Sequence, residues 1–135
     1  VEMHEVLGDE NMFLFGLKAA EAAELSRHYD PKLLYDRDPV LRRVLDAIRD
    51  GFRDGVSYED IYRRLLFGGD CPADQYLLLA DFQAYCQAEQ RMAETYADKE
   101  KWNRMSLHNI ARSGIFAADR AVAQYADNIW HVPHK

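Results

Sequence analysis

The chain has 135 residues, of which 48% are hydrophobic and 30% charged, a composition typical of globular rather than disordered proteins. Its formal net charge of −6 argues against a nucleic-acid-binding surface, which needs a clustered excess of Lys and Arg. No apolar run approaches the ~18–20 residues that span a bilayer, and no signal peptide is visible, so we expect a cytoplasmic protein that binds neither membrane nor nucleic acid.

The N-terminal part is predicted to contain a short helix, one strand and a second helix. Apolar residues at helical spacing predict the first helix over residues 1–7, ending at Gly8. The apolar run Met12–Phe15 is too short for its periodicity to separate strand from helix, but its length and two phenylalanines favour a buried parallel strand. The alanine-rich stretch 18–26 favours a helix.

The middle of the chain carries clear helix start and stop signals. Asp38 followed by Pro39 predicts a helix start, because Asp caps free backbone N–H groups and Pro fits the first turn. Apolar residues then recur at helical spacing up to Gly51, which ends this helix. Ser57 is predicted to cap the next helix, and the glycines at 68–69 interrupt the helical pattern.

Three further helices are predicted in the C-terminal half. Asp81 is expected to cap a long helix, a second runs over about 99–113 and ends at Gly114, and the last runs over about 118–130. The apolar stripe of this last helix consists of Val122, Tyr125, Ala126 and Ile129.

The predicted strand has no partner strand in this chain. A lone strand leaves its backbone N–H and C=O groups unpaired, and a parallel crossover needs a second strand. We therefore expect a mainly α chain with one short strand near Met12–Phe15. Residues 1–135 would form a single segment at the end of a larger α/β domain. The chain begins with Val1 rather than Met, which also favours a segment of a longer protein.

No motif for catalysis, metal binding or phosphate binding is apparent. The histidines lack the i, i+4 spacing with Glu that marks a zinc helix; they are His4, His28, His108, His131 and His134. Cys71 and Cys86 have no CxxC partner and are expected to be reduced thiols. There is no glycine-rich phosphate loop and no GxSxG elbow. We therefore predict no catalytic, cofactor-binding or metal-binding residue.

The order of several short segments resembles the C-terminal part of the α-glucan (glycogen, maltodextrin or starch) phosphorylase family. The segments that carry it are Val1-Glu2-Met3, Gly8-Asp9-Glu10-Asn11-Met12-Phe13-Leu14-Phe15-Gly16, Tyr35-Asp36-Arg37, Ala80-Asp81-Phe82, Gln90-Arg91, Asn109-Ile110-Ala111, Asp119-Arg120, Ala123-Gln124-Tyr125-Ala126 and Ile129-Trp130. The ordered set covers essentially the whole chain. Residues 53–57 and 66–74 depart from the animal enzymes and favour a bacterial-type member.

The resemblance implies a two-lobed, Rossmann-like glycosyltransferase fold of the GT-B type in a longer enzyme. That enzyme would release glucose 1-phosphate from α-1,4-glucans and phosphate, using pyridoxal phosphate held on a lysine upstream of Val1. None of the lysines here lies in the family's cofactor motif; they are Lys18, Lys32, Lys99, Lys101 and Lys135. This segment alone is therefore expected to bind no cofactor and to be inactive.

The role left for this segment is structural. The strand near Met12–Phe15 would complete a sheet of the C-terminal lobe, and the last helix would return toward the N-terminal lobe with Val122, Tyr125 and Trp130 at the seam. The main partner would be the upstream remainder of the enzyme. Without it, we expect self-association through Met12–Phe15, since apolar side chains and an open strand edge would be exposed. The alternative is an independent helical protein–protein interaction module.

Overall fold

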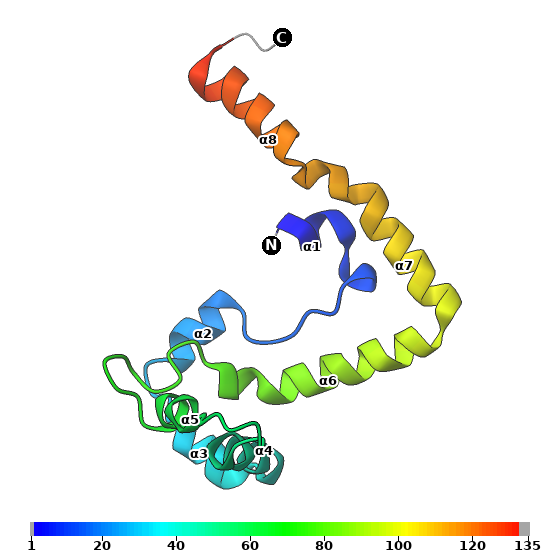
Figure 1. Cartoon of the computed structure of the whole chain (residues 1–135). Coiled ribbons are helices and arrows are strands. Elements are labelled where there is room, and N and C mark those ends of the chain that lie inside the picture. Colours follow the sequence, from blue (N-terminus) through cyan, green and yellow to red (C-terminus); the bar gives the residue numbers. More distant parts are fainter. Residues whose placement is uncertain (1, 133–135) are drawn as a thin grey trace. The chain divides into compact units, whose positions relative to one another are not determined.

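The structure is a computed structural model that describes residues 2–132, and all its regular elements are helices (Figure 1). In chain order they are α1 (Glu2–Leu7), η1 (Asp9–Asn11), α2 (Ala19–Leu25), α3 (Pro31–Arg37), α4 (Pro39–Asp50), α5 (Glu59–Leu66), α6 (Leu78–Ala97), α7 (Lys99–Arg112), η2 (Ser113–Phe116), α8 (Ala118–Tyr125) and η3 (Ala126–Trp130). The helices predicted from the sequence are all present, which confirms a mainly α chain. Val1 and residues 133–135, including His134 and Lys135, lie outside the described residues.

The chain divides into two compact units. Unit 2 is the continuous stretch Phe15–Ala88, whereas unit 1 combines the residues up to Leu14 with those from Glu89 onward. Each unit is described by itself below.

Unit 2 is organised around a small leucine core. Leu41, Leu45, Leu66 and Leu79 are buried together, and Leu45 is the most completely enclosed. Half-buried neighbours complete this cluster; they are Leu34, Tyr35, Ile48, Tyr62, Leu65 and Phe82. The apolar stripes of α3, α4, α5 and the first turns of α6 therefore meet in one core, as their helical spacing requires.

Two Asp-Pro pairs begin consecutive helices in unit 2. The carboxylate of Asp38 accepts hydrogen bonds from the N–H groups of Val40 (2.9 Å) and Leu41 (3.1 Å), so the predicted start of α4 is confirmed. Asp30 caps α3 in the same way, through the N–H of Lys32 at 2.9 Å. The Asp30-Pro31 pair is the same signal that predicted α4, and the sequence interpretation overlooked it.

The start of α6 differs from the prediction. The helix begins at Leu78. The Asp74 carboxylate caps its first turn by accepting hydrogen bonds from the N–H groups of Leu78 (2.9 Å) and Leu79 (2.8 Å). Asp81, the predicted cap, instead accepts from the N–H of Leu17 at 2.9 Å. Its carboxylate closes over Gly16, where an added Cβ would lie 2.6 Å from the Asp81 Oδ2 atom. Gly16 also has φ of 87°, which a residue with a side chain rarely adopts.

In unit 1, α7 binds the N-terminal stretch through polar side chains. The Asn109 amide donates to the carbonyl oxygen of Asn11 at 3.1 Å, and Arg112 donates to that of Val6 at 2.5 Å. Few side chains are fully enclosed in this unit. Among its described apolar residues only Leu7 and Ala126 are buried, so directed hydrogen bonds contribute much of the attachment.

The predicted strand at Met12–Phe15 does not form in this chain. The segment is not helical, and Met12 is extended with φ −139° and ψ 156°, but no described residue pairs with it in a β-ladder. The strand prediction was therefore wrong for these residues. The physical reason is the one already visible in the sequence: a ladder needs a second strand, and residues 2–132 contain none.

The C-terminal helix changes its winding near its end. α8 gives way at Ala126 to a π-helical turn, η3, and His131 follows in a left-handed conformation with φ 50°. Of the predicted apolar stripe only Ala126 is buried, while Val122, Tyr125 and Ile129 are more than half exposed. No helix in the described part of the chain combines the length and hydrophobicity needed to cross a membrane.

Candidate functional site

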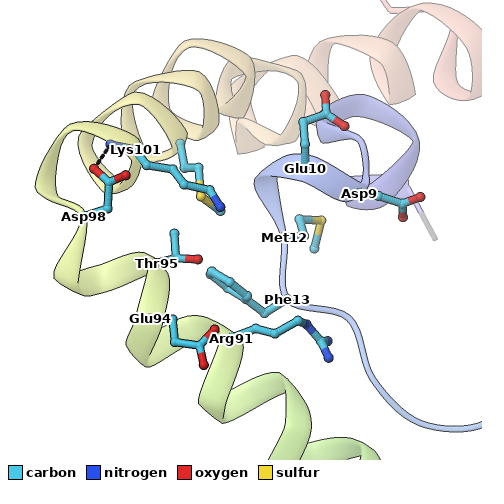
Figure 2. A pocket seen from close by; sticks show the side chains of 10 residues that line it. Asp9, Glu10, Met12, Phe13, Arg91, Glu94, Thr95, Asp98 and Lys101 are labelled. Carbon is cyan, nitrogen blue, oxygen red and sulfur yellow. Dashed lines mark hydrogen bonds between the residues drawn. The ribbon is translucent and has the colours of Figure 1, made fainter.

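Unit 1 contains a cavity of about 460 Å³ beside Met12 and Phe13 (Figure 2). Its lining comes from η1, the extended segment, the last turns of α6 and the first turns of α7; the residues are Asp9, Glu10, Met12, Phe13, Arg91, Glu94, Thr95, Asp98, Lys101 and Met105. Met12, Phe13 and Met105 make one part of the wall apolar. Charged side chains make up most of the remainder.

Local contacts hold the cavity wall in place. The Phe13 ring stacks on Trp102 with centroids 6.3 Å apart, and Trp102 meets Tyr96 edge-on at 5.0 Å. Arg91 donates to the carbonyl oxygen of Leu14 at 3.2 Å. The Asp98 carboxylate caps α7 by accepting from the backbone N–H of Lys101 at 3.0 Å, the hydrogen bond drawn in Figure 2.

The charge of the cavity does not suit an anionic ligand. Its carboxylates are Asp9, Glu10, Glu94 and Asp98, and they outnumber the basic groups of Arg91 and Lys101. A site for a phosphate needs the opposite balance, because clustered cations or free backbone N–H groups bind the anion. The cavity therefore fits neither a phosphate substrate nor the phosphate of a cofactor.

The cavity also lacks a nucleophile paired with a base. The hydroxyl group in the cavity lining belongs to Thr95, which is 7% exposed. Among the described residues no His, Asp or Glu forms a hydrogen bond with that hydroxyl, so nothing activates it for attack. We therefore assign no bond-making chemistry to this cavity.

A second polar centre lies in unit 2 around a buried carboxylate. Asp74 is 3% exposed and accepts from the Tyr29 hydroxyl at 2.6 Å in addition to the two N–H groups that begin α6. Burial, together with the hydrogen bond to Asp74, raises the pKa of Tyr29 well above its ordinary range. Asp74 and Leu77 both have positive φ, 42° and 57°, so the loop before α6 holds strained backbone.

This buried centre has the features of a structural element rather than of a reactive site. The Tyr29 hydroxyl and the N–H groups of Leu78 and Leu79 all donate to the Asp74 carboxylate. No described polar side-chain atom is left buried without a hydrogen-bond partner. The sequence interpretation missed Asp74, because a lone Asp in a loop gives no local signal. Its role depends on Tyr29, which lies far away in the sequence.

The described histidines and cysteines show no arrangement that binds a metal ion. Among the described residues no group of His, Cys, Asp and Glu side chains could hold a metal ion. Cys71 is exposed and Cys86 half-buried, and both are free thiols, as predicted. His131 forms a hydrogen bond through Nδ1 with the carbonyl oxygen of Asp127 at 2.8 Å.

The predicted seam residues lie at the end of unit 1. Val122, Tyr125 and Trp130 are 55%, 51% and 58% exposed. The rings of Tyr125 and Trp130 meet edge-on with centroids 6.0 Å apart, so the aromatic pair partly covers itself. Their role at a seam between lobes stays a prediction, since no second lobe is present.

Comparison with known proteins settles the family of the chain. A family model described as carbohydrate phosphorylase matches residues 1–132. The chain belongs to this family. It is 38% identical to the glycogen phosphorylase of Chlamydia pneumoniae over 138 residues, which include 100% of this chain and 16% of that protein. Over 136 residues, including 98% of this chain, it is 36% identical to the human liver form and 38% identical to the Synechocystis enzyme.

This phosphorylase chain spans only about 16% of the length of the curated relatives it matches. Bacterial and human relatives match it almost equally well, so the expectation of a bacterial-type member stays a prediction. The resemblance seen in the sequence is thereby confirmed at the level of the family.

The described lysines do not fit pyridoxal phosphate, the cofactor implied for the family. An aldehyde-binding lysine needs an enclosed site with donors for the cofactor phosphate, yet Lys18, Lys32, Lys99 and Lys101 are all exposed. The Lys32 and Lys99 ammonium groups lie over aromatic rings, those of Phe67 and Tyr96. No step through the cofactor can be derived from these residues.

Proposed function

We propose that this chain is the C-terminal part of the catalytic domain of an α-glucan phosphorylase, and that its role there is structural. The longer enzyme would release glucose 1-phosphate from α-1,4-glucans, with pyridoxal phosphate bound upstream of this segment. The observation that carries the proposal is the match of the whole chain to glycogen phosphorylases, of which it covers about 16%.

The chemistry of the chain supports a structural role. Phosphorolysis needs a bound phosphate and a group that delivers a proton to the leaving sugar oxygen. The acid-rich cavity of unit 1 suits no phosphate, and the buried carboxylate of Asp74 is occupied by structural hydrogen bonds. Neither place offers the groups that the reaction requires.

The exposed apolar side chains of unit 1 support the presence of a covering partner. Leu107 and Ile110 of α7 are 67% and 66% exposed, and Ile129 of η3 is 62% exposed. Apolar surface of this kind favours contact with another protein surface. In the proposed enzyme, the upstream lobe would supply that surface, and the fold would be the two-lobed GT-B type.

Reconstitution from two pieces tests the proposal. The glycogen phosphorylase of Chlamydia pneumoniae would be expressed without the region aligned to this chain and mixed with the purified chain, maltodextrin and phosphate. We expect glucose 1-phosphate only when both pieces are present. The matched control is Leu45→Asp, which places a charge in the core and should abolish the effect.

Two results would contradict this proposal. The first is glucose 1-phosphate production by the purified chain alone, or a stoichiometric borohydride-reducible adduct of pyridoxal phosphate on one of its lysines. The second is a correctly folded chain that restores no activity to the truncated relative. The alternative, an independent helical interaction module, predicts this second result.

A further inference from the structure

Unit 2 contains a cavity of about 580 Å³ beside the loop that connects α5 with α6. Local hydrogen bonds fix the conformation of this loop. The Gly69 N–H donates to the carbonyl oxygen of Cys71 at 3.0 Å. The Asp74 N–H donates to that of Arg64 at 3.3 Å, while the Asp74 carboxylate caps α6. The shape of the cavity is therefore set by the fold of unit 2 itself.

Tyr76 lies on the wall of this cavity with its ring uncovered. It is 77% exposed, and its side chain makes no hydrogen bond or ring contact with any described residue. Its neighbours Asp74 and Leu77 are both buried and have positive φ. Backbone strain of this kind is common where a loop holds a ligand. The strained loop thus keeps an aromatic ring at the surface instead of packing it into the core.

Free polar side chains line the cavity around this ring. Four of them are exposed and form no hydrogen bond or ion pair with the described residues; they are Asp60, Arg64, Asp70 and Gln75. The guanidinium groups of Arg63 and Arg64 balance the free carboxylates, since the Asp74 carboxylate is already occupied by structural hydrogen bonds. Such a mixture of donors and acceptors suits an uncharged ligand that is rich in hydroxyl groups.

We propose that this cavity is a non-catalytic binding site for a short stretch of an α-1,4-glucan chain. The identity of the sugar rests on the proposed function, because the longer enzyme would act on such chains. The C–H face of one glucosyl residue stacks on the Tyr76 ring, and its hydroxyl groups exchange hydrogen bonds with Arg64, Asp70 and Gln75. A volume of about 580 Å³ falls within the range of about 300–1,000 Å³ for sites that bind small molecules.

The consequence for the enzyme would be retention of its polymeric substrate. One stacked ring and a few exposed hydrogen bonds give a dissociation constant on the order of 1 mM for a single site. A glucan particle carries many chain ends, so even weak binding raises the effective concentration of chains near the enzyme. The site holds the chain and leaves bond cleavage to the upstream part of the enzyme.

Protection of Cys71 from alkylation tests this proposal on the purified chain. Cys71 is exposed and lines the cavity, whereas Cys86 lies outside its lining and provides an internal reference. Maltoheptaose at twice its dissociation constant should slow the reaction of Cys71 with iodoacetamide about three-fold, because only the free fraction reacts. The rate at Cys86 should stay unchanged.

Substitutions at exposed positions separate the site from general stickiness. Tyr76→Ala should raise the dissociation constant for maltoheptaose at least about ten-fold, whereas Tyr76→Phe keeps the ring and should retain the protection. Phe52→Ala is the matched control, since Phe52 is 59% exposed in unit 2 but lies outside the cavity lining. It should leave the protection unchanged. Circular dichroism would verify that each variant is folded.

Three results would overturn the proposal. The first is a Cys71 alkylation rate that maltoheptaose leaves unchanged up to about 10 mM. The second is equal protection in the wild-type chain and in Tyr76→Ala. The third is protection by inorganic phosphate but not by maltoheptaose, which would identify an anion site.

This inference and the proposed function fail in different ways. A chain that restores activity to the truncated relative, but whose Cys71 maltoheptaose does not protect, would remove the glucan site and leave the proposed function standing. Protection without restored activity would support the site and contradict the proposed function.

Discussion

At the scale of single residues, the hydrogen bond between Tyr29 and Asp74 joins parts of unit 2 that are distant in sequence. Tyr29 precedes α3, whereas Asp74 caps the first turn of α6, so one carboxylate fixes both places. Asp38 has a comparable double role. It caps α4 and accepts from the side-chain amide of Gln83 on α6, and that hydrogen bond, with those from the helix N–H groups, lowers the pKa of Asp38.

Removing the Tyr29 hydroxyl should destabilise the chain measurably. Tyr29→Phe deletes a hydrogen bond to a buried carboxylate, and we expect the free energy of unfolding to fall by about 1–2 kcal/mol. Urea unfolding followed by circular dichroism would measure this. Tyr76→Phe, at a tyrosine that is 77% exposed, is the control and should change stability little. Equal effects of the two substitutions would show that the Tyr29 hydroxyl is dispensable.

The same hydroxyl should make the chain sensitive to alkali. The pKa of Tyr29 is raised in the folded chain, so its stabilising contribution is complete below the unfolded pKa of about 10 and is lost as pH rises above it. Between about pH 8 and about pH 11, the wild-type chain should lose more stability than Tyr29→Phe. Parallel slopes would contradict this assignment. Tyr35, whose hydrogen bond to Asp46 raises its pKa to about 12, contributes equally in both proteins.

At the scale of elements, local sequence signals predicted the helices but not the contacts between residues that are distant in the sequence. The Asp-Pro start of α4 and the glycine that ends it act within a few residues, so the sequence shows them directly. The start of α6 was misplaced because two aspartates compete there. The choice of Asp74 over Asp81 depends on Tyr29 and Leu17, whose distance from α6 in the sequence hides the contact.

The predicted strand and the cavity also depend on contacts between distant segments, which the local sequence does not show. Residue types predicted a buried parallel strand at Met12–Phe15, and this prediction was wrong because a ladder depends on residues outside the segment. The cavity beside it could not be predicted either. Its lining unites η1 with α6 and α7, and no sequence motif records that Phe13 stacks on Trp102.

The last helix offers a prediction at this scale. In the isolated chain Tyr125→Ala should lower the free energy of unfolding by less than about 1 kcal/mol, since Tyr125 is 51% exposed and its ring meets that of Trp130 edge-on. In the longer enzyme the loss should reach a few kcal/mol, the range for truncating an enclosed aromatic side chain. Thermal unfolding of both proteins would compare the two values. Equal small losses would show that Tyr125 faces solvent in the enzyme as well.

At the scale of the whole molecule, the two units differ in how much apolar surface they enclose. Unit 2 holds the leucine core, whereas the described apolar residues buried in unit 1 are Leu7 and Ala126. Burial of apolar surface is the main favourable term in folding. Unit 1 should therefore open more readily than unit 2, and the chain should not unfold in a single step.

Hydrogen exchange would test this difference. We expect amide protons of α4 and α5 to exchange more slowly than those of α7 and α8. Leu45→Ala should cost unit 2 about 2–5 kcal/mol, because Leu45 is 1% exposed, and should speed exchange within residues 15–88. Exchange in α8 should stay unchanged. Uniform protection along the chain, or equal acceleration in both units, would show that the units unfold together.

Unit 1 is built from two separate stretches of the chain, and this has a consequence for its folding during synthesis on the ribosome. All residues of unit 2 are available once Ala88 has emerged, but the first stretch of unit 1 must wait for α7, whose Asn109 and Arg112 bind its carbonyl oxygens. From Ala88 to Arg112, translation at roughly 5–20 residues per second takes on the order of a few seconds. During that interval Met12–Leu14 is already outside the ribosome but α7 is not yet complete, and a chaperone that recognises short apolar stretches would find this segment uncovered.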